Sequence, residues 1–178
     1  MNHSMSLVDW LVIVAAILVV IGIAVGMNLW TMRVYKRHRR IVADNDACFR
    51  ETARMLGLQF MASPYYEHPV VGRIPSFGTV RGKIDGVEVA LKIADDYACD
   101  GPRLFWTELR AVLPKGHVLT LPGNPSFRLE QRAKTLVLTP IIQEKGSSQS
   151  YLYRLESDPG KLAALLRELT ATARGQME

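Results

Sequence analysis

The hydrophobic pattern begins with one uninterrupted apolar stretch, from Trp10 to Trp30, whose only polar side chain is Asn28. Twenty residue steps of α-helix cover about 30 Å, which is the thickness of the hydrocarbon layer of a bilayer. Indole rings favour the headgroup level, so Trp10 and Trp30 are predicted to lie at the two membrane interfaces. The pattern therefore predicts a transmembrane helix over residues 7–31, preceded by a short extracytoplasmic tail at residues 1–6.

A basic block follows the apolar stretch at once and predicts its orientation. The cationic side chains of the block are Arg33, Lys36, Arg37, Arg39 and Arg40. Cationic flanks stay on the cytoplasmic side, whereas the N-terminal flank offers only the α-amino group, His3 and Asp9. We expect the N-terminus outside and the remaining chain in the cytoplasm, on a plasma membrane of the bacterial inner-membrane type. The same cations are expected to contact anionic lipid headgroups. The absence of a basic N-terminal region favours an uncleaved anchor over a signal peptide.

Small residues within the apolar stretch suggest a surface for helix packing. Gly22 and Gly26 form a G-x-x-x-G pattern, and small residues one turn apart let a second transmembrane helix approach closely. The pattern predicts association with other transmembrane subunits or with a second copy of this chain. The alternative is incidental composition, because glycine is common in membrane spans.

The helical pattern continues beyond the membrane. No glycine or proline occurs from Met27 to Leu56, and residues 32–57 are predicted to form a basic juxtamembrane and stalk helix that continues the membrane helix. An apolar stripe at helical spacing closes this segment; it comprises Cys48, Phe49, Ala53 and Leu56. Gly57 is a typical C-terminal stop. One helix from Leu7 to Leu56 is expected, and its last turns should dock on the soluble domain.

The pattern then changes to a period of two, which predicts strands. Residues 80–84 and 87–93 alternate apolar and polar side chains around Asp85-Gly86, a strong signal for a type I′ hairpin turn. Residues 104–113 predict a long strand, with Trp106 on the face opposite the apolar one. Shorter strands are expected at 117–121, 127–130, 135–139 and 151–156. The proline-rich residues 61–78 are interpreted as a loop.

An amphipathic helix ends the chain. Asp158 is a predicted N-cap, Pro159 occupies the first helical position, and leucines recur at helical spacing to about Ala173. The leucine face is expected to cover the sheet, and residues 175–178 are expected to fray. The predicted fold class is α+β: a cytoplasmic domain over residues 58–174 with a mostly antiparallel sheet of about five to seven strands.

Charge and cysteine content narrow the function classes. The chain has 178 residues and a formal charge of +5, but the positive excess is concentrated in the juxtamembrane block. A nucleic-acid binder would carry clustered cations among aromatics on its folded domain, so no nucleic-acid partner is expected. Cys48 and Cys99 lack any metal-ligand spacing and are interpreted as free thiols in a reducing compartment.

Candidate chemistry is sparse. The sequence has no nucleophile elbow, phosphate-binding glycine loop or H-E-x-x-H run, so we expect no catalytic site, cofactor, metal or small-molecule substrate. His68 and His117 are the histidines of the predicted soluble domain. Tyr65, Tyr66 and Trp106 are candidates for a partner-binding surface, and padding of the core edge is the alternative for the tyrosines.

These observations favour a single-pass membrane-anchored accessory or scaffold subunit of a membrane protein complex, with a cytoplasmic docking domain. The alternative is a membrane-tethered binding module for lipid headgroups or a protein ligand. About seven antiparallel strands followed by one C-terminal amphipathic helix resemble the pleckstrin-homology architecture, in element order and without a motif. No ligand-binding residue is implied by that resemblance. A third interpretation is a tethered enzyme that uses Cys99 or His117.

Overall fold

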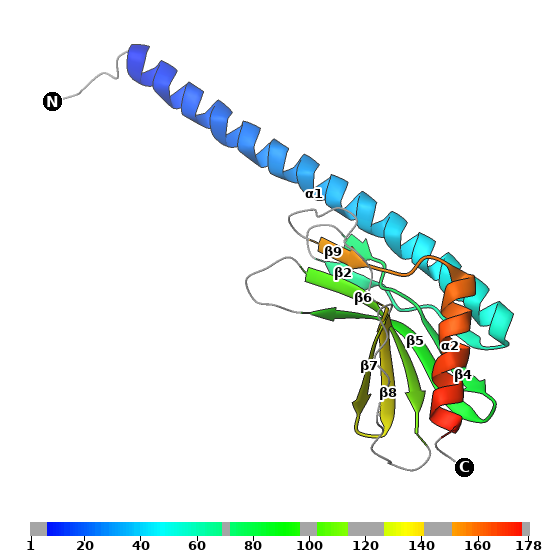
Figure 1. The fold of residues 1–178 in the computed structure, drawn as a ribbon. Coiled ribbons are helices and arrows are strands. Elements are labelled where there is room, and N and C mark those ends of the chain that lie inside the picture. Colours follow the sequence, from blue (N-terminus) through cyan, green and yellow to red (C-terminus); the bar gives the residue numbers. More distant parts are fainter. Residues whose placement is uncertain (1–6, 69–71, 97–102, 114–126, 141–150, 176–178) are drawn as a thin grey trace.

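The computed structural model describes residues 7–68, 72–96, 103–113, 127–140 and 151–175. A long helix α1 (Leu7–Leu56) precedes the sheets, and helix α2 (Pro159–Arg174) follows them (Figure 1). The strands are β1 (Gln59–Met61), β2 (Tyr66–His68), β3 (Gly72–Ile74), β4 (Thr79–Ile84), β5 (Val87–Asp96), β6 (Arg103–Val112), β7 (Phe127–Arg132), β8 (Thr135–Pro140) and β9 (Tyr151–Arg154). The α+β prediction is confirmed.

Helix α1 has the predicted bounds. It ends at Gly57, whose φ of +65° suits glycine, and the Leu58 amide donates to the Ala53 carbonyl at 2.8 Å. Every described side chain from residue 7 to 30 is exposed, and the Asn28 amide group donates to the Ala24 carbonyl of its own helix at 3.0 Å. Helix α1 is thus long and apolar enough to cross a membrane.

The domain packs along much more of α1 than its last turns. Buried side chains on α1 begin at His38 and recur at helical spacing to Ala53; they are His38, Val42, Asn45, Cys48, Phe49, Thr52 and Ala53. The last turns of α1 dock on the domain as predicted, and the contact extends back to His38. Polar His38, Asn45 and Thr52 interrupt the apolar stripe, which is why the sequence pattern shows only its C-terminal part.

The main sheet has seven strands in the order β1-β4-β5-β6-β8-β7, with β9 beside β6. The neighbours along this order are antiparallel, whereas β9 runs parallel to β6. Asp85 and Gly86 have φ values of 50° and 84°, and they join β4 to β5 in the predicted hairpin. The parallel β9 departs from the all-antiparallel layout on which the pleckstrin-homology resemblance was based.

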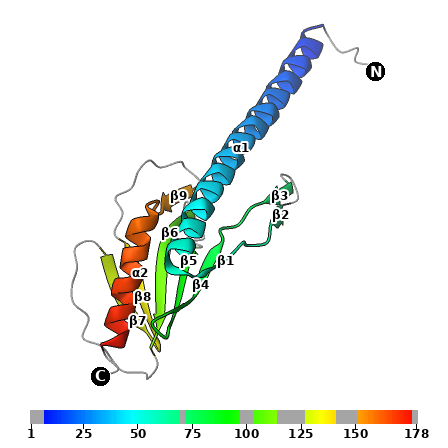
Figure 2. The same cartoon turned by 90° about the vertical axis from the view of Figure 1, so that its right-hand side faces the viewer.

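Both helices lie on one face of the sheet, as Figures 1 and 2 show. Helix α2 contacts β5, β6 and β8, whereas α1 contacts β1, β4 and α2. Fully buried leucines come from both layers: Leu91, Leu109, Leu136, Leu138, Leu162, Leu166 and Leu169. Burying one such side chain contributes about 1.5–3 kcal/mol, so the predicted leucine face of α2 holds the helix on the sheet.

Residues 61–78, interpreted from sequence as a loop, include short strands. β1 pairs with β4 at the edge of the main sheet, and β2 pairs with β3 in a separate hairpin. Pro64 lies between β1 and β2, and Pro75 follows β3, so neither interrupts a strand. Figure 2 shows the β2–β3 hairpin beside α1, away from the main sheet.

Several predictions concern segments outside the described residues. These are the tail at residues 1–6, the strand at 117–121 and the residues 176–178. Cys99 and His117, the candidates for catalysis, also lie outside the described residues. The third interpretation of function therefore stays a prediction.

Candidate functional site

The sheet face opposite the two helices is the candidate site. Successive side chains of a strand point to opposite faces, so the alternates of the core residues Val80, Val89 and Leu109 line this second face. They include many charged side chains: Arg81, Lys83, Glu88, Lys92, Glu108, Arg110, Arg128, Glu130 and Arg132. We call this surface the open face, because neither α1 nor α2 covers it.

A buried carboxylate organises the open face. Glu108 in β6 is 1% exposed and stands directly opposite Lys92 in β5, whose ammonium lies 3.8 Å from Oε1. The Arg110 guanidinium contacts the same oxygen, and Arg132 Nη1 lies 4.0 Å from Oε2. Removing a carboxylate from water is costly unless it is paired, so the surrounding cations account for its burial. Arg132 lies closer to Glu130, at 3.0 Å, and Glu130 also pairs with Arg128. Two carboxylates thus serve four cations, so the network is positively charged.

A shallow groove of about 430 Å³ crosses the open face beside this network. Its lining comprises Arg81, Gly82, Lys83, Glu88, Val89, Ala90, Arg110, Val112 and Thr135. The strand register places Ala90 between Arg81 and Arg110, so a methyl group separates two guanidinium side chains. Among the described residues, Arg81 and Lys83 form no ion pair, whereas Arg110 pairs with Glu108. Glu88 is the only carboxylate among the described residues that line the groove. The groove is therefore electropositive, with an exposed apolar side chain at Val112.

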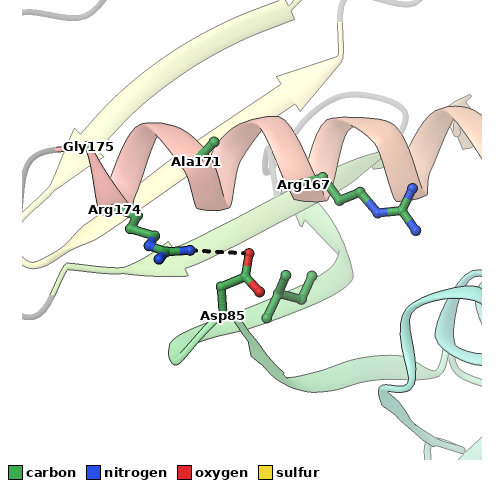
Figure 3. A pocket seen from close by; sticks show the side chains of 6 residues that line it. Asp85, Arg167, Ala171, Arg174 and Gly175 are labelled. Atoms are coloured by element: carbon green, nitrogen blue, oxygen red, sulfur yellow. Dashed lines mark ion pairs between the residues drawn. The ribbon is translucent and has the colours of Figure 1, made fainter.

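A second hollow of about 240 Å³ lies between the C-terminal end of α2 and the β4–β5 turn. Figure 3 shows Arg174 directed at Asp85, and the ion pair measures 3.7 Å. Arg167 also lines the hollow but points away from Asp85 along the helix. Both partners of the ion pair are more than half exposed, so it contributes at most about 1 kcal/mol. We interpret this contact as a tie between helix and hairpin.

The residues predicted for the membrane lie on the exposed part of α1. Trp10 and Trp30 are 58% and 53% exposed, at the two ends of the apolar stretch. A Cβ added at Gly22 or Gly26 would meet nothing within 4 Å. The helix face that carries the glycines is thus open to lipid or to another helix. The interface and helix-packing roles of these four residues stay predictions.

The basic block is divided by the fold. Arg33, Lys36, Arg37, Arg39 and Arg40 are all exposed, whereas His38 in their midst is buried. His38 Nδ1 lies 2.7 Å from the Tyr153 hydroxyl, and the rings of Phe77 and Phe105 lie 5.7 and 5.9 Å from its own. An aromatic cluster thus attaches the domain to α1 two turns after Trp30. The sequence prediction missed this contact because His38 has cationic neighbours.

The predicted partner residues come from different parts of the fold. Tyr65 is 64% exposed just before the β2–β3 hairpin, and Tyr66 begins β2. Trp106 lies half-buried on the open face in β6, paired with Arg154 of β9. Both helices pack on the other face of the sheet, so neither covers Trp106. Of the three residues, only Trp106 shares a face with the groove.

Buried polar groups mark the interface between α1 and the domain. Asn45 is 5% exposed, and neither its Nδ2 nor its Oδ1 atom has a hydrogen-bond partner within the described structure. The Gly78 amide donates to Asp46 Oδ1 at 2.8 Å, but burial still raises the pKa of that carboxyl. Burial also raises the pKa of the Cys48 thiol to about 11, which makes it unreactive.

Metal-binding clusters are absent among the residues that the structure describes. No group of three His, Cys, Asp or Glu side chains there is arranged to hold a metal ion. Buried Glu108 is surrounded by cations rather than by a nucleophile. The described chemistry of the open face is charge pairing.

Comparisons add no relative. No family model, curated protein or solved structure matches the chain.

Proposed function

We propose that this chain is a single-pass membrane-anchored accessory or scaffold subunit whose cytoplasmic domain docks a partner protein through the open face. The observation that carries the proposal is the electropositive groove on a sheet face left uncovered by either helix. Charged side chains held in fixed positions on strands give an interface its specificity and its rate of association.

The anchor supports the same function. Apolar residues from Trp10 to Trp30 match the thickness of a bilayer, and the adjacent cationic block favours a cytoplasmic location for the domain. His38 follows Trp30 by eight residues, or about 12 Å of helix, and already contacts the domain. The domain is thus held close to the headgroups in one orientation.

A second transmembrane helix is the proposed membrane partner. Gly22 and Gly26 present an uncovered small-residue surface, which fits packing against another subunit or a second copy of this chain. The cationic side chains of the block would rest on anionic headgroups beside that helix pair.

Lipid binding by the domain itself is less favoured. The groove residue Arg110 lies five positions beyond Phe105 in β6, a displacement of about 17 Å along the strand. Phe105 belongs to the aromatic cluster that contacts His38, at the end of the domain nearer the apolar half of α1. A groove at the opposite end faces the cytoplasm rather than the headgroups of its own membrane.

Photo-crosslinking in cells tests the docking proposal. p-Benzoylphenylalanine at Val112, in the groove, is expected to give a discrete higher-mass adduct that mass spectrometry identifies as another protein. The matched control places it at Ala164, an exposed position of α2 on the helix side of the domain. Adducts from neither position, or equal adducts from both, would contradict docking through the open face.

Topology needs its own test. Alkaline phosphatase fused after Glu178 is expected to be inactive, and green fluorescent protein fused there is expected to fluoresce. Active phosphatase would place the domain outside the cytoplasm and overturn the proposal.

A further inference from the structure

We propose that the groove binds an extended acidic segment of the partner protein, with carboxylates at alternate positions. This inference rests on the docking function proposed above and assigns the chemistry of the partner. The residues that carry it are Arg81 and Lys83 of β4 and Arg110 of β6, around the low floor at Ala90.

The charges of the groove favour an anionic occupant. Glu88 is its only carboxylate, and Lys83, directly opposite in the β4–β5 register, makes no ion pair with it. Arg81 likewise makes no ion pair within the part of the chain that the structure describes. Arg110 is held against Glu108, but that carboxylate is shared with Lys92 and Arg132. The cations therefore retain capacity for an incoming carboxylate.

The spacing of the cations favours an extended peptide. Arg81 and Lys83 are alternate residues of one strand, so their Cα atoms are about 7 Å apart. Alternate side chains of an extended peptide have the same spacing. Arg110 lies two strands from Arg81 in the same register row, at about 10 Å, on the other side of Ala90. One phosphate group is too small to satisfy cations set that far apart along and across the sheet.

The floor of the groove adds an apolar contact. Val112 is 39% exposed at the end of β6, and Thr135 stands opposite it in β8. A peptide that alternates acidic and apolar side chains would direct its carboxylates to the cations while its backbone passes over Ala90. The proposed ligand is therefore an extended acidic strand. A helix fits less well, because the side chains on one face of a helix recur every three or four residues rather than every two.

The position of the groove favours a protein partner over a lipid surface. Lys83 lies one residue before Ile84, which ends β4, next to the Asp85–Gly86 turn and the C-terminal end of α2. Figures 1 and 2 place that end of the domain away from the apolar half of α1. A partner that reaches the groove thus approaches from the cytoplasm.

Fluorescence anisotropy with the full chain in zwitterionic nanodiscs tests the inference. The probe is a labelled seven-residue peptide with three glutamates at alternate positions between valines and threonines. A peptide of the same composition with its glutamates contiguous at one end is the control. We expect at least tenfold tighter binding of the alternating peptide, and weaker binding as salt rises from 50 to 300 mM. Equal affinity for the two peptides would overturn the inference.

Groove variants locate the binding site. Lys83→Glu and the milder Lys83→Gln are expected to weaken binding of the alternating peptide by at least tenfold and threefold, respectively. Arg128→Glu, on β7 of the same face but outside the groove, should change it less than twofold. Equal losses from Lys83→Glu and Arg128→Glu would indicate nonspecific attraction and overturn the inference. Thermal unfolding of each variant establishes that the domain is folded.

A lipid arm tests the competing partner. Vesicles with about 30% phosphatidylserine are offered to the same nanodiscs, and no binding that depends on Lys83 is expected. Lipid binding that Lys83→Glu abolishes would overturn the acidic-peptide inference. If a partner protein is cross-linked at Val112 but the two peptides bind equally well, the acidic-peptide inference is wrong. The proposal that the open face docks a partner would still hold.

Discussion

Replacing Asn45 by leucine should stabilise the domain. Asn45 lies on α1, against the domain, and its side chain is almost entirely buried without a hydrogen bond from either amide atom. Leucine has the same number of side-chain heavy atoms, branched at the same position. The substitution therefore removes two polar atoms while it preserves the approximate shape of the side chain.

The expected gain follows from the desolvation of the amide. An unsatisfied buried polar group costs about 1–3 kcal/mol, and leucine also has a slightly better helix propensity than asparagine. Part of the gain is lost if the tetrahedral leucine crowds Phe49, one turn along the buried stripe of α1. We expect a net stabilisation of about 1–3 kcal/mol. For a chain of this length, that corresponds to a rise of about 3–10 °C in the unfolding midpoint.

Tryptophan fluorescence provides the assay, with the full chain in detergent micelles. Trp10 and Trp30 lie on the exposed helix, so the change on heating reports mainly Trp106 in the sheet. Asp44→Leu, at the adjacent exposed position, is the matched control and should change the midpoint by no more than about 2 °C. Asn45→Ala should gain less than Asn45→Leu, because it leaves a void.

The reasoning would be refuted by a lower midpoint for Asn45→Leu together with an unchanged one for Asp44→Leu. That result would mean that the Asn45 amide forms hydrogen bonds in the native protein. The interface between α1 and the domain would then be held by a polar contact rather than weakened by a buried amide.

Three further predictions concern single residues. Burial raises the pKa of the Asp46 carboxyl above its ordinary value of 3.8. The folded protein therefore loses stability as the pH rises from 3.8 through the raised pKa, because the buried carboxyl must then ionise. Asp46→Asn should therefore stabilise by less than about 1 kcal/mol at pH 7, with a gain that shrinks toward pH 4; a constant gain across thermal scans would contradict this. Because Cys48 is buried and its pKa is raised, a disulfide reagent at pH 8 should react with it at least about 100-fold more slowly in the folded than in the denatured protein. The measurement uses a Cys99→Ala background, and similar rates in the two states would refute the burial of Cys48. Asp158 accepts hydrogen bonds from the first turn of α2 at 2.8 and 3.2 Å, so Asp158→Ala should lower the unfolding midpoint by about 2–4 °C, and an unchanged midpoint would count against the cap.

Local signals predicted the elements whose formation depends on nearby residues. Asp85-Gly86 adopts the positive φ values that its turn requires, and Gly57 ends α1 at the predicted place. Asp158 caps α2, and the leucine spacing predicts which face of that helix is buried. In each case the residue type acts through its own backbone or through neighbours within one turn.

Long-range pairing was beyond such signals. β9 lies parallel to β6, and nothing in either segment indicates which strand its neighbour is. His38 is buried because Phe77, Phe105 and Tyr153 from distant segments converge on it. Its cationic neighbours indicated an exposed position.

The open face illustrates the same limit at the candidate site. The alternation in residues 104–113 assigned Glu108 to the polar side of its strand, which the structure confirms. That pattern is typical of exposure, yet Glu108 is fully buried, because Lys92, Arg110 and Arg132 from three strands surround it. Their convergence depends on the strand order, and so does the groove beside them. The sequence shows the charges of the face but not their arrangement.

Under the proposed function, anchoring and docking would be mechanically coupled, because α1 is both the proposed membrane span and part of the domain core. His38 and Phe49 are buried against the domain on the same helix that carries Trp30. A flexible linker would let the domain rotate, and a partner would have to order it on binding. A continuous helix fixes the height and direction of the open face in advance, which lowers that entropic cost. We therefore expect the buried stripe of α1 to affect the affinity for the proposed partner without contacting it.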